Sequence, residues 1–170
     1  MKCNRLQECC DTELIEHLHI ECDRAGQCIR CSDCRRIINC VENQRKYQYL
    51  NTLGNHVILY HMDGGIIDDN TTAKCDFLLV AGEQSPICIL VELKGNDVSY
   101  AISQIDATLQ VFSDFFNGCS RVYARVIATQ VMPNIKATAK VVKLRKKVEK
   151  MYGTLEIKSR QFQDKDIELI

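Results

Sequence analysis

Two apolar runs of strand length, joined by a short link, constrain the fold of this chain most. The runs cover 74–80 and 87–95, and the link between them carries glycine, serine and proline. Apolar, β-branched runs separated in this way are typical of two adjacent antiparallel strands. Because side chains in a strand alternate between faces, Glu92 and Lys94 point the same way. The hairpin also brings Asp76 near them, so we expect two carboxylates and an ammonium group at one sheet edge.

The order Asp76, hairpin, Glu92-Leu93-Lys94 resembles the motif of the PD-(D/E)XK nuclease superfamily, with Cys75 at the place of that family's loosely kept proline. The resemblance extends from about Asn55 to the C-terminus. It implies an α/β protein with the restriction-endonuclease-like fold, a mixed central β-sheet flanked by helices. The residues alone also allow a simpler interpretation, in which Asp76 is a strand-end hydrogen-bonding residue and the other two form an ordinary ion pair.

The resemblance also implies the chemistry of the site. Asp76, Glu92 and the carbonyl oxygen of Leu93 would bind Mg²⁺ or Mn²⁺, which prefers oxygen ligands and activates water. Lys94 would orient or deprotonate that water, or neutralise developing charge. Family members often place a glutamine in the following helix, which makes Gln104 a candidate contact to phosphate or water, with Gln110 as a less favoured substitute. The expected activity is a metal-dependent nuclease that hydrolyses phosphodiester bonds, with DNA favoured over RNA as substrate.

Two other classes of function stay open. The first is a nucleic-acid-binding adaptor that keeps the nuclease-like scaffold and a zinc knuckle but does not cut. The second is a cysteine-rich metal or redox protein. A different enzyme is not indicated, because the sequence contains no phosphate-binding glycine-rich loop and no Gly-x-Ser-x-Gly elbow.

Cysteines are concentrated in the first quarter of the chain, which holds eight of the eleven. An odd total without a secretory signal favours reduced thiols or a metal site over disulfides. Cys28, Cys31 and Cys34 follow two consecutive C-x2-C spacings, and Cys40, or Cys22 as a substitute, could complete a tetrahedral Zn²⁺ site. An iron–sulfur cluster and unliganded, packed thiols remain alternatives. We therefore divide the chain into a cysteine-rich segment, residues 1–40, with a candidate zinc knuckle, and a nuclease-like core, residues 41–170.

The segment before the hairpin is expected to hold two helices, at about 11–21 and 33–50. The family places a helix before the core sheet that often contributes an acid to the metal site, and Glu42 is the acid in the middle of the second helix. The alternative is a surface glutamate that pairs with Arg45 or Lys46 on the same helix.

The remaining elements follow from hydrophobic period and capping residues. We expect a strand at about 56–67, a helix that begins after an N-cap at Asp97 and ends near Gly118, and a strand at 121–129. A helix at 134–152 and a strand at 154–160 complete the order. Asp63, beside two glycines, is either an accessory acid or a bulge residue.

Charge is unevenly distributed although the formal net charge is zero. Residues 63–97 hold seven acids and two bases, whereas residues 136–150 hold seven bases and one acid. An acidic pocket beside a basic helix suits a metal-dependent phosphodiesterase, and Lys140, Lys143 and Lys147 are candidate contacts to a phosphate backbone. Two solvated faces of opposite sign are the simpler alternative.

The expected location is the cytoplasm. No apolar segment approaches the length needed to span a bilayer, and no apolar signal core follows the N-terminus. We therefore expect a soluble, intracellular protein that binds nucleic acid and no membrane. A homodimer is a further expectation, since one site of this kind cuts one strand.

Overall fold

A computed structural model of the protein describes residues 28–67, 70–82 and 85–170, and every structural statement concerns these residues. They form a mixed α/β fold with nine strands and three α-helices. The elements, in chain order, are β1 (Ile29–Asp33), β2 (Ile37–Glu42), β3 (Arg45–Leu50), β4 (Val57–His61), β5 (Phe77–Ala81), β6 (Ile87–Lys94), α2 (Val98–Val111), α3 (Ser113–Asn117), β7 (Arg121–Ala128), the 3-10 turn η1 (Ile135–Ala137), α4 (Ala139–Glu149), β8 (Leu155–Ser159), β9 (Gln161–Lys165) and the 3-10 turn η2 (Asp166–Glu168).

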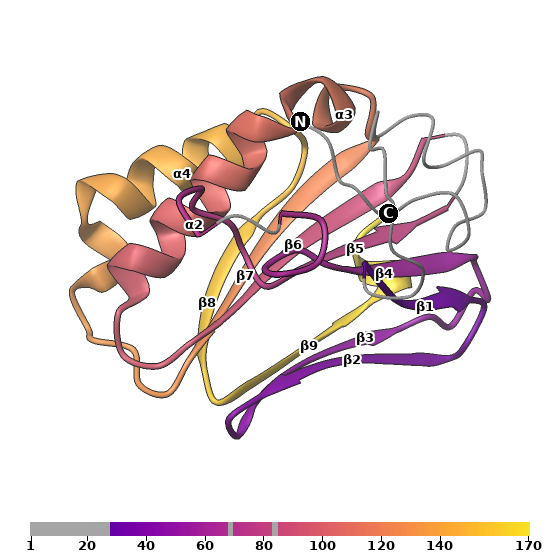
Figure 1. The fold of residues 1–170 in the computed structure, drawn as a ribbon, viewed down its shortest axis with the longest axis horizontal. Coiled ribbons are helices and arrows are strands. Elements are labelled where there is room, and N and C mark those ends of the chain that lie inside the picture. The colour runs from indigo at the N-terminus through magenta and orange to yellow at the C-terminus, as the bar shows by residue number, and fades with distance from the viewer. Residues whose placement is uncertain (1–27, 68–69, 83–84) are drawn as a thin grey trace.

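The strands form a main sheet and a smaller one. The main sheet has the order β1-β4-β5-β6-β7-β8, antiparallel as far as β6 and parallel from β6 to β8. Parallel neighbours need a crossover, and α2 and α4 provide the two crossovers. The smaller sheet has the order β2-β3-β9. Figure 1 shows the helices over one face of the main sheet and the smaller sheet over the other.

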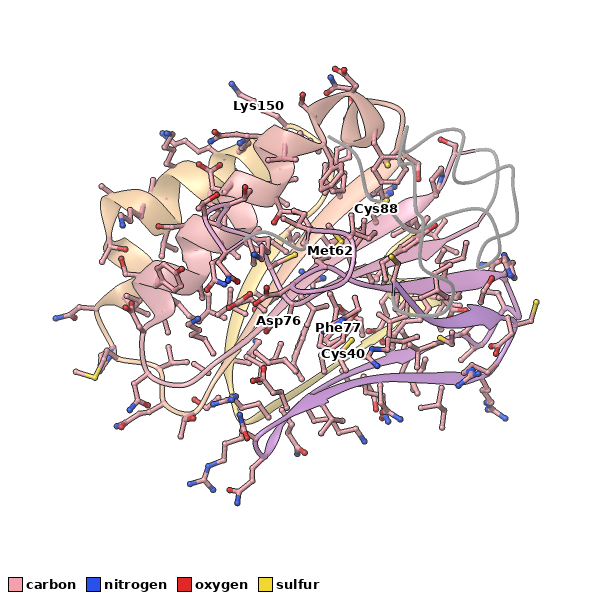
Figure 2. All side chains as sticks on the ribbon, viewed as in Figure 1. Cys40, Met62, Asp76, Phe77, Cys88 and Lys150 are labelled. Carbon is pink, nitrogen blue, oxygen red and sulfur yellow. The ribbon has the colours of Figure 1, made fainter. Side chains whose placement is uncertain are left out.

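Each face of the main sheet therefore borders its own hydrophobic core. The helix-side core includes Leu90 and Ile105, and the core between the two sheets includes Ile89 and Tyr47. Figure 2 marks residues of both cores: Met62 and Cys88 on the helix side, Cys40 and Phe77 between the sheets. Because β6 is buried on both faces, its residues form a continuous apolar run that is interrupted at Glu92.

The predicted hairpin is confirmed. β5 and β6 are antiparallel neighbours, with Phe77 opposite Val91 and Ala81 opposite Ile87. The predicted mixed α/β class is confirmed as well. The helix after the hairpin begins where expected, because the Asp97 carboxylate accepts a hydrogen bond of 2.8 Å from the Tyr100 N–H.

The helix predicted at 33–50 was wrong. This segment contains the end of β1 and the antiparallel pair β2–β3, which is connected at Asn43 and Gln44. Both connecting residues have positive φ, 43° and 67°, as a two-residue hairpin turn requires. Residues 29–42 thus lie in both sheets, across the expected segment boundary at residue 40. The helix expected at 11–21 lies outside the described residues.

Three further elements differ from the expectation. The strand at 56–67 ends at His61, where the chain turns back so tightly that a Cβ on Gly65 would lie 2.0 Å from the His61 carbonyl oxygen. The helix at 97–118 is divided into α2 and α3, and the helix at 134–152 begins as a 3-10 turn.

β9 was not predicted. Its Asp164 accepts a hydrogen bond of 2.6 Å from Arg125 of β7, which connects the small sheet to the main one.

Within the described residues, no helix is both long enough and apolar enough to cross a bilayer.

Candidate active site

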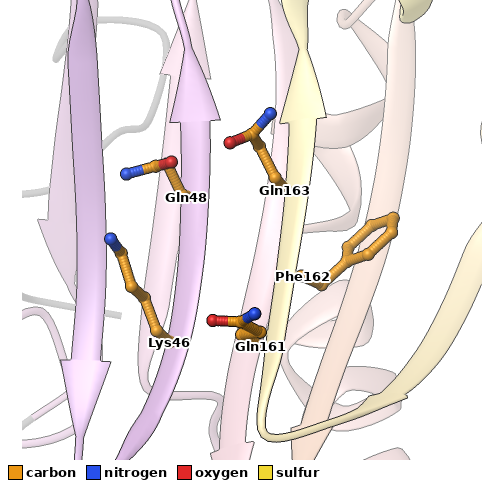
Figure 3. A pocket seen from close by; sticks show the side chains of 5 residues that line it. All are labelled: Lys46, Gln48, Gln161, Phe162 and Gln163. Atoms are coloured by element: carbon orange, nitrogen blue, oxygen red, sulfur yellow. The ribbon is translucent and has the colours of Figure 1, made fainter.

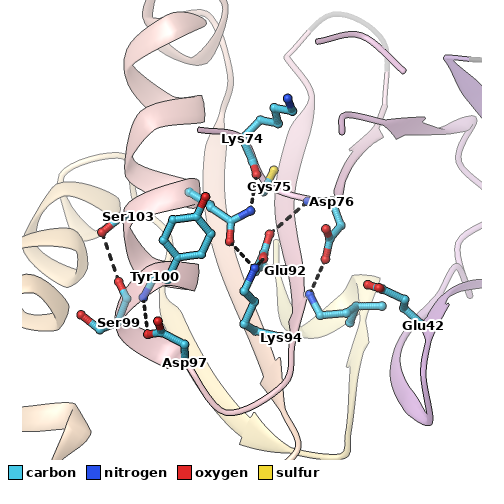
Figure 4. A network of polar contacts seen from close by, with 12 residues as sticks. Glu42, Lys74, Cys75, Asp76, Glu92, Lys94, Asp97, Ser99, Tyr100 and Ser103 are labelled. Atoms are coloured by element: carbon cyan, nitrogen blue, oxygen red, sulfur yellow. Dashed lines mark hydrogen bonds and ion pairs between the residues drawn. The ribbon is translucent and has the colours of Figure 1, made fainter. Parts of the chain in front are cut away.

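The candidate site lies at the end of β6, where the side chains of the hairpin motif meet. The Asp76 N–H donates a hydrogen bond of 3.1 Å to Glu92 Oε2, and the Leu93 N–H donates one of 2.7 Å to Asp76 Oδ2. β5 begins only at Phe77, so the Asp76 carboxylate accepts from the backbone of β6 just beyond the end of the β5–β6 ladder. The predicted meeting of Asp76 with Glu92 is therefore present, with the two residues joined through backbone amides (Figure 4).

Lys94 is held in place by three neighbours. Its Nζ lies 2.9 Å from Gln104 Oε1, 3.6 Å from Glu92 Oε1 and 4.5 Å from the centre of the Tyr100 ring. The side chain keeps 29% of its surface exposed, whereas Glu92 keeps 1%. The ammonium group thus lies between a buried carboxylate and the protein surface. The predicted placement of Glu92 and Lys94 on one face of the strand agrees with their distance of 3.6 Å.

Helix α2 positions the groups that the strands bring together. The Gln104 side-chain oxygen accepts a hydrogen bond from Lys94, and its nitrogen donates a hydrogen bond of 2.8 Å to the Lys74 carbonyl. Both polar ends of the amide are therefore hydrogen-bonded. One turn later, Thr108 Oγ1 accepts a hydrogen bond of 2.9 Å from the Cys75 N–H. The segment before Asp76 is therefore fixed against α2, and Gln104 is placed to orient Lys94.

Burial is the main influence on the two carboxyl groups. It raises the pKa of Glu92 to about 9, with the nearby Asp76 raising it further and Lys94 lowering it. Burial also raises the pKa of Asp76 to about 6, against the lowering effect of the Leu93 N–H, while the charges of Glu42 and Asp63 raise it. Ionising both carboxyl groups is therefore costly here unless a bound cation compensates their charge.

The residues present fit a hard divalent ion. Among the residues that the structure describes, the buried Glu92 Oε1 has no hydrogen-bond partner, and it lies 3.6 Å from the Lys94 ammonium group. In a strand, the N–H and C=O of one residue point to the same side, so the Leu93 carbonyl faces the side on which its N–H meets Asp76. In the described part of the chain, no three His, Cys, Asp or Glu side chains gather closely enough to hold a metal by themselves. Two carboxylates, one carbonyl and several waters are a ligand set that Mg²⁺ accepts.

Glu42 reaches the neighbourhood of the site from an element other than the predicted one. It is the last residue of β2, and Figure 4 shows its carboxylate on the small-sheet side of the site, near Asp76. Its charge is among the influences that raise the pKa of Asp76. The predicted helix was wrong, but the predicted third acid lies beside the site.

The four predicted zinc ligands are not brought together. Cys28 belongs to the helix-side core, Cys31 and Cys40 lie between the two sheets, and Cys34 is exposed. Burial raises the pKa of the Cys31 and Cys40 thiols. Three of these thiols therefore act as packed core groups in the structure. Cys22, the proposed substitute, lies outside the described residues.

Two of the three predicted phosphate-binding lysines hold α4 against α2. Lys147 Nζ lies 2.6 Å from Asp106 Oδ1, and Lys140 Nζ lies 3.2 Å from Ser103 Oγ. Lys143 is exposed on the outer side of α4.

Two residues near the site were not predicted. Tyr100 lies four residues before Gln104, so the helix period could have placed it on the same face. Arg45 of β3 donates 3.3 Å to Thr129 Oγ1, just beyond β7. No local signal indicated Arg45, because the segment resembled a helix with Arg45 at its surface.

A groove of about 300 Å³ lies on the outer face of the small sheet, away from the candidate site. It is lined by Lys46 and Gln48 of β3 and by Gln161, Phe162 and Gln163 of β9 (Figure 3). None of these residues belongs to the network around Lys94.

Comparisons with family models, with curated proteins and with solved structures gave no significant match. The class of the protein therefore rests on its own architecture: a mixed α/β fold in which a buried glutamate and a partly exposed lysine, two residues apart, lie at the end of a central strand.

Proposed function

We propose that this protein is a metal-dependent nuclease with a restriction-endonuclease-like core that hydrolyses phosphodiester bonds in nucleic acid, DNA in preference to RNA. One observation carries the proposal: Asp76, Glu92, Lys94 and Gln104 form one connected network. Lys94 donates a hydrogen bond of 2.9 Å to Gln104, the Asp76 N–H donates to the Glu92 carboxylate, and the Leu93 N–H donates to the Asp76 carboxylate. A buried glutamate and a half-buried aspartate beside an ammonium group are an arrangement suited to a divalent ion and an anionic substrate.

Asp76, Glu92 and the Leu93 carbonyl would hold Mg²⁺ or Mn²⁺. When bound, the ion supplies a Lewis acid and a more acidic water. Lys94, partly exposed at the edge of the site, would stabilise the negative charge that develops on the phosphate. Gln104 is a positioning residue in this proposal, because both polar ends of its amide are already engaged by Lys94 and Lys74.

Substrate binding would include the basic helix α4. Lys143 is exposed there, while Lys140 and Lys147 contribute charge from positions bonded to α2. Contacts of this kind carry no sequence information and weaken as salt rises.

The decisive experiment incubates the purified protein with a panel of single- and double-stranded DNA and RNA, with Mg²⁺, with Mn²⁺ and with EDTA. Asp76→Asn removes one metal-binding charge and is expected to abolish cleavage. Asp97→Asn is the matched control, because asparagine also caps a helix N-terminus, and it should cleave like the wild type. No metal-dependent cleavage of any substrate by the wild type would sink the proposal.

A second candidate is a nucleic-acid-binding adaptor that no longer cleaves. The observation in its favour is the pKa of Glu92, raised to about 9 by burial, since a carboxyl that keeps its proton needs no cation at neutral pH. Tight binding without cleavage across all metals and substrates would support this candidate over the nuclease.

A further inference from the structure

Arg45 is a buried cation beside the candidate site, and within the described residues its side chain makes a single hydrogen bond. It belongs to β3 and keeps 8% of its surface exposed. Its Nη1 donates a hydrogen bond of 3.3 Å to Thr129 Oγ1. A Cβ added to Gly95 would lie 3.8 Å from the same nitrogen. The Thr129 N–H in turn donates to the carbonyls of Lys94 and Gly95, so the guanidinium lies against the segment that follows Lys94.

The charge of Arg45 is not neutralised within the described part of the chain. No carboxylate there lies within 4.0 Å of its nitrogens, and its buried Nε has no hydrogen-bond partner. Its cross-strand neighbour Glu42 does not pair with it and instead raises the pKa of Asp76.

Arg125 provides the contrast within the same protein. This fully buried arginine donates from Nε and Nη2 to the two oxygens of Asp164, at 2.6 and 3.3 Å, and from Nη1 to the Thr154 carbonyl at 2.7 Å. A buried guanidinium is costly unless such partners are present. Arg45 therefore lacks the partners that a purely structural arginine has in this fold.

We propose that Arg45, together with the Thr129 hydroxyl, forms a phosphate-binding subsite for a nucleic-acid backbone next to the Asp76–Glu92–Lys94 site. The identity of the ligand rests on the proposed nuclease function. A guanidinium is always charged and its planar fork matches two phosphate oxygens, which a point charge does not. A Cβ on Gly95 would be in ordinary van der Waals contact with Arg45 Nη1, at 3.8 Å, so the guanidinium lies close to the backbone there.

The subsite lies on the opposite side of β6 from Lys94. Residues of β6 that alternate with Glu92 and Lys94, such as Leu93, face the small sheet, and the inward residues of β3 face them. Gly95 continues that face. A strand of nucleic acid at this edge would meet Lys94 from the helix side and Arg45 from the small-sheet side.

The test measures binding rather than cleavage. Anisotropy of a short fluorescent DNA oligonucleotide in EDTA compares the wild type with Arg45→Met and with Lys46→Met. Lys46 is the neighbouring residue on the outer face of β3, where it lines the groove of Figure 3. We expect about tenfold weaker binding or more for Arg45→Met, as for loss of a charge-assisted hydrogen-bond pair. Lys46→Met should stay within about twofold of the wild type.

Thermal unfolding of the same variants separates a ligand role from a structural one. Since methionine fills the site without a buried, unpartnered nitrogen, Arg45→Met should melt at or above the wild-type temperature. Weaker binding in a variant that is no less stable is a result that a merely structural arginine would not produce.

Three results would overturn the subsite: unchanged affinity in Arg45→Met, equal losses in both variants, or a larger loss in Lys46→Met. If Arg45→Met does not fold, Arg45→Lys is used in its place, because lysine keeps the positive charge but lacks the planar fork. Several-fold weaker DNA binding is expected for Arg45→Lys, and unchanged affinity would overturn the inference. The binding assay contains EDTA and therefore does not depend on cleavage. A wild type that never cleaves DNA or RNA would refute the proposed nuclease activity, and the comparison of DNA affinities would still test the phosphate-binding subsite.

Discussion

Two acid-x-lysine pairs lie in the main sheet, and the comparison between them separates the motif from the site. Glu92 and Lys94 occupy β6, and Glu156 and Lys158 occupy β8. Their acid-to-ammonium distances are 3.6 and 3.0 Å. Each lysine also lies over an aromatic ring, Lys94 at 4.5 Å from the centre of Tyr100 and Lys158 at 5.2 Å from the centre of Phe162.

Burial and additional partners distinguish the two pairs. Glu92 keeps 1% of its side chain exposed and Glu156 keeps 36%. The β6 pair has Asp76 and Gln104 within its network, whereas the ion pair of β8 has the more exposed lysine, at 41% against 29%. An exposed pair of this kind contributes little. Both pairs thus have the same acid–lysine spacing, and the β6 pair differs from the β8 pair in its buried acid and in the hydrogen bond that connects that acid to Asp76.

The largest expected difference between the pairs is in catalysis. Lys94→Ala should reduce metal-dependent cleavage about a thousandfold, because it removes the charge that stabilises the phosphate during the reaction. Lys158→Ala, the matched lysine of the exposed pair, should leave the rate within about twofold of the wild type. Initial rates on the best substrate measure both, and comparable losses in the two variants would contradict the assignment of the site to β6.

The next difference concerns the pH dependence of stability without metal. Burial raises the pKa of Glu92 from 4.5 to about 9, so between these values the folded protein holds a proton that the unfolded chain has released. The free energy of unfolding should therefore fall as pH rises through this window, by up to about 1.4 kcal/mol per pH unit. Asp76, raised from 3.8 to about 6, adds to the fall at the lower end.

Glu92→Gln should flatten this slope, and Glu156→Gln, the matched exposed acid, should keep it. Urea unfolding at a series of pH values in EDTA measures the slope. A Glu92→Gln variant with the wild-type slope would mean that Glu92 is already ionised in the folded protein.

A smaller effect is expected from metal. Under the proposed function, Mg²⁺ or Mn²⁺ would bind only the folded site, so it should stabilise the wild type by about 2.7 kcal/mol at a hundred times the dissociation constant. Glu156→Gln should respond in the same way. Glu92→Gln should lose the response, which thermal unfolding with and without EDTA measures. Equal stabilisation of the two glutamine variants would place the ion elsewhere.

The smallest effect is expected at Gln104. Gln104→Leu leaves the Lys74 carbonyl and Lys94 Nζ without their amide partner, so kcat should fall about tenfold with little change in KM. Gln110→Leu is the control on the same helix, since Gln110 is exposed and bonds only Asp106 within the described residues. A change in KM alone would indicate that Gln104 contacts substrate instead of positioning Lys94.

The parts of the fold that were predictable are those with a local period. Alternation along β6 placed Glu92 and Lys94 on one face, whereas Gln104, which bonds Lys94, was a candidate because of the resemblance to the nuclease family. The carboxylate of Asp97 marked the start of α2 because capping depends on residues only three positions apart.

The parts that were missed depend on partners distant in sequence. β3 is rich in polar residues with high helical propensity, and the turn at Asn43 and Gln44 that connects it to β2 contains no glycine to indicate a hairpin. β9 resembles a polar loop until Asp164 meets Arg125, 39 residues earlier. Arg45 was missed for the same reason, since its position beside Gly95 exists only once the two sheets are stacked.

The position of Leu93 between the two sheets determines which amino-acid substitutions it can accept during evolution. Its side chain is enclosed between the two sheets at 2% exposure, and its N–H bonds Asp76. What this residue contributes to the site therefore comes from backbone atoms, which every substitution except proline keeps. Any apolar residue that fits between the sheets would preserve the contact, so this position is free to drift while Glu92 and Lys94 on either side of it are not.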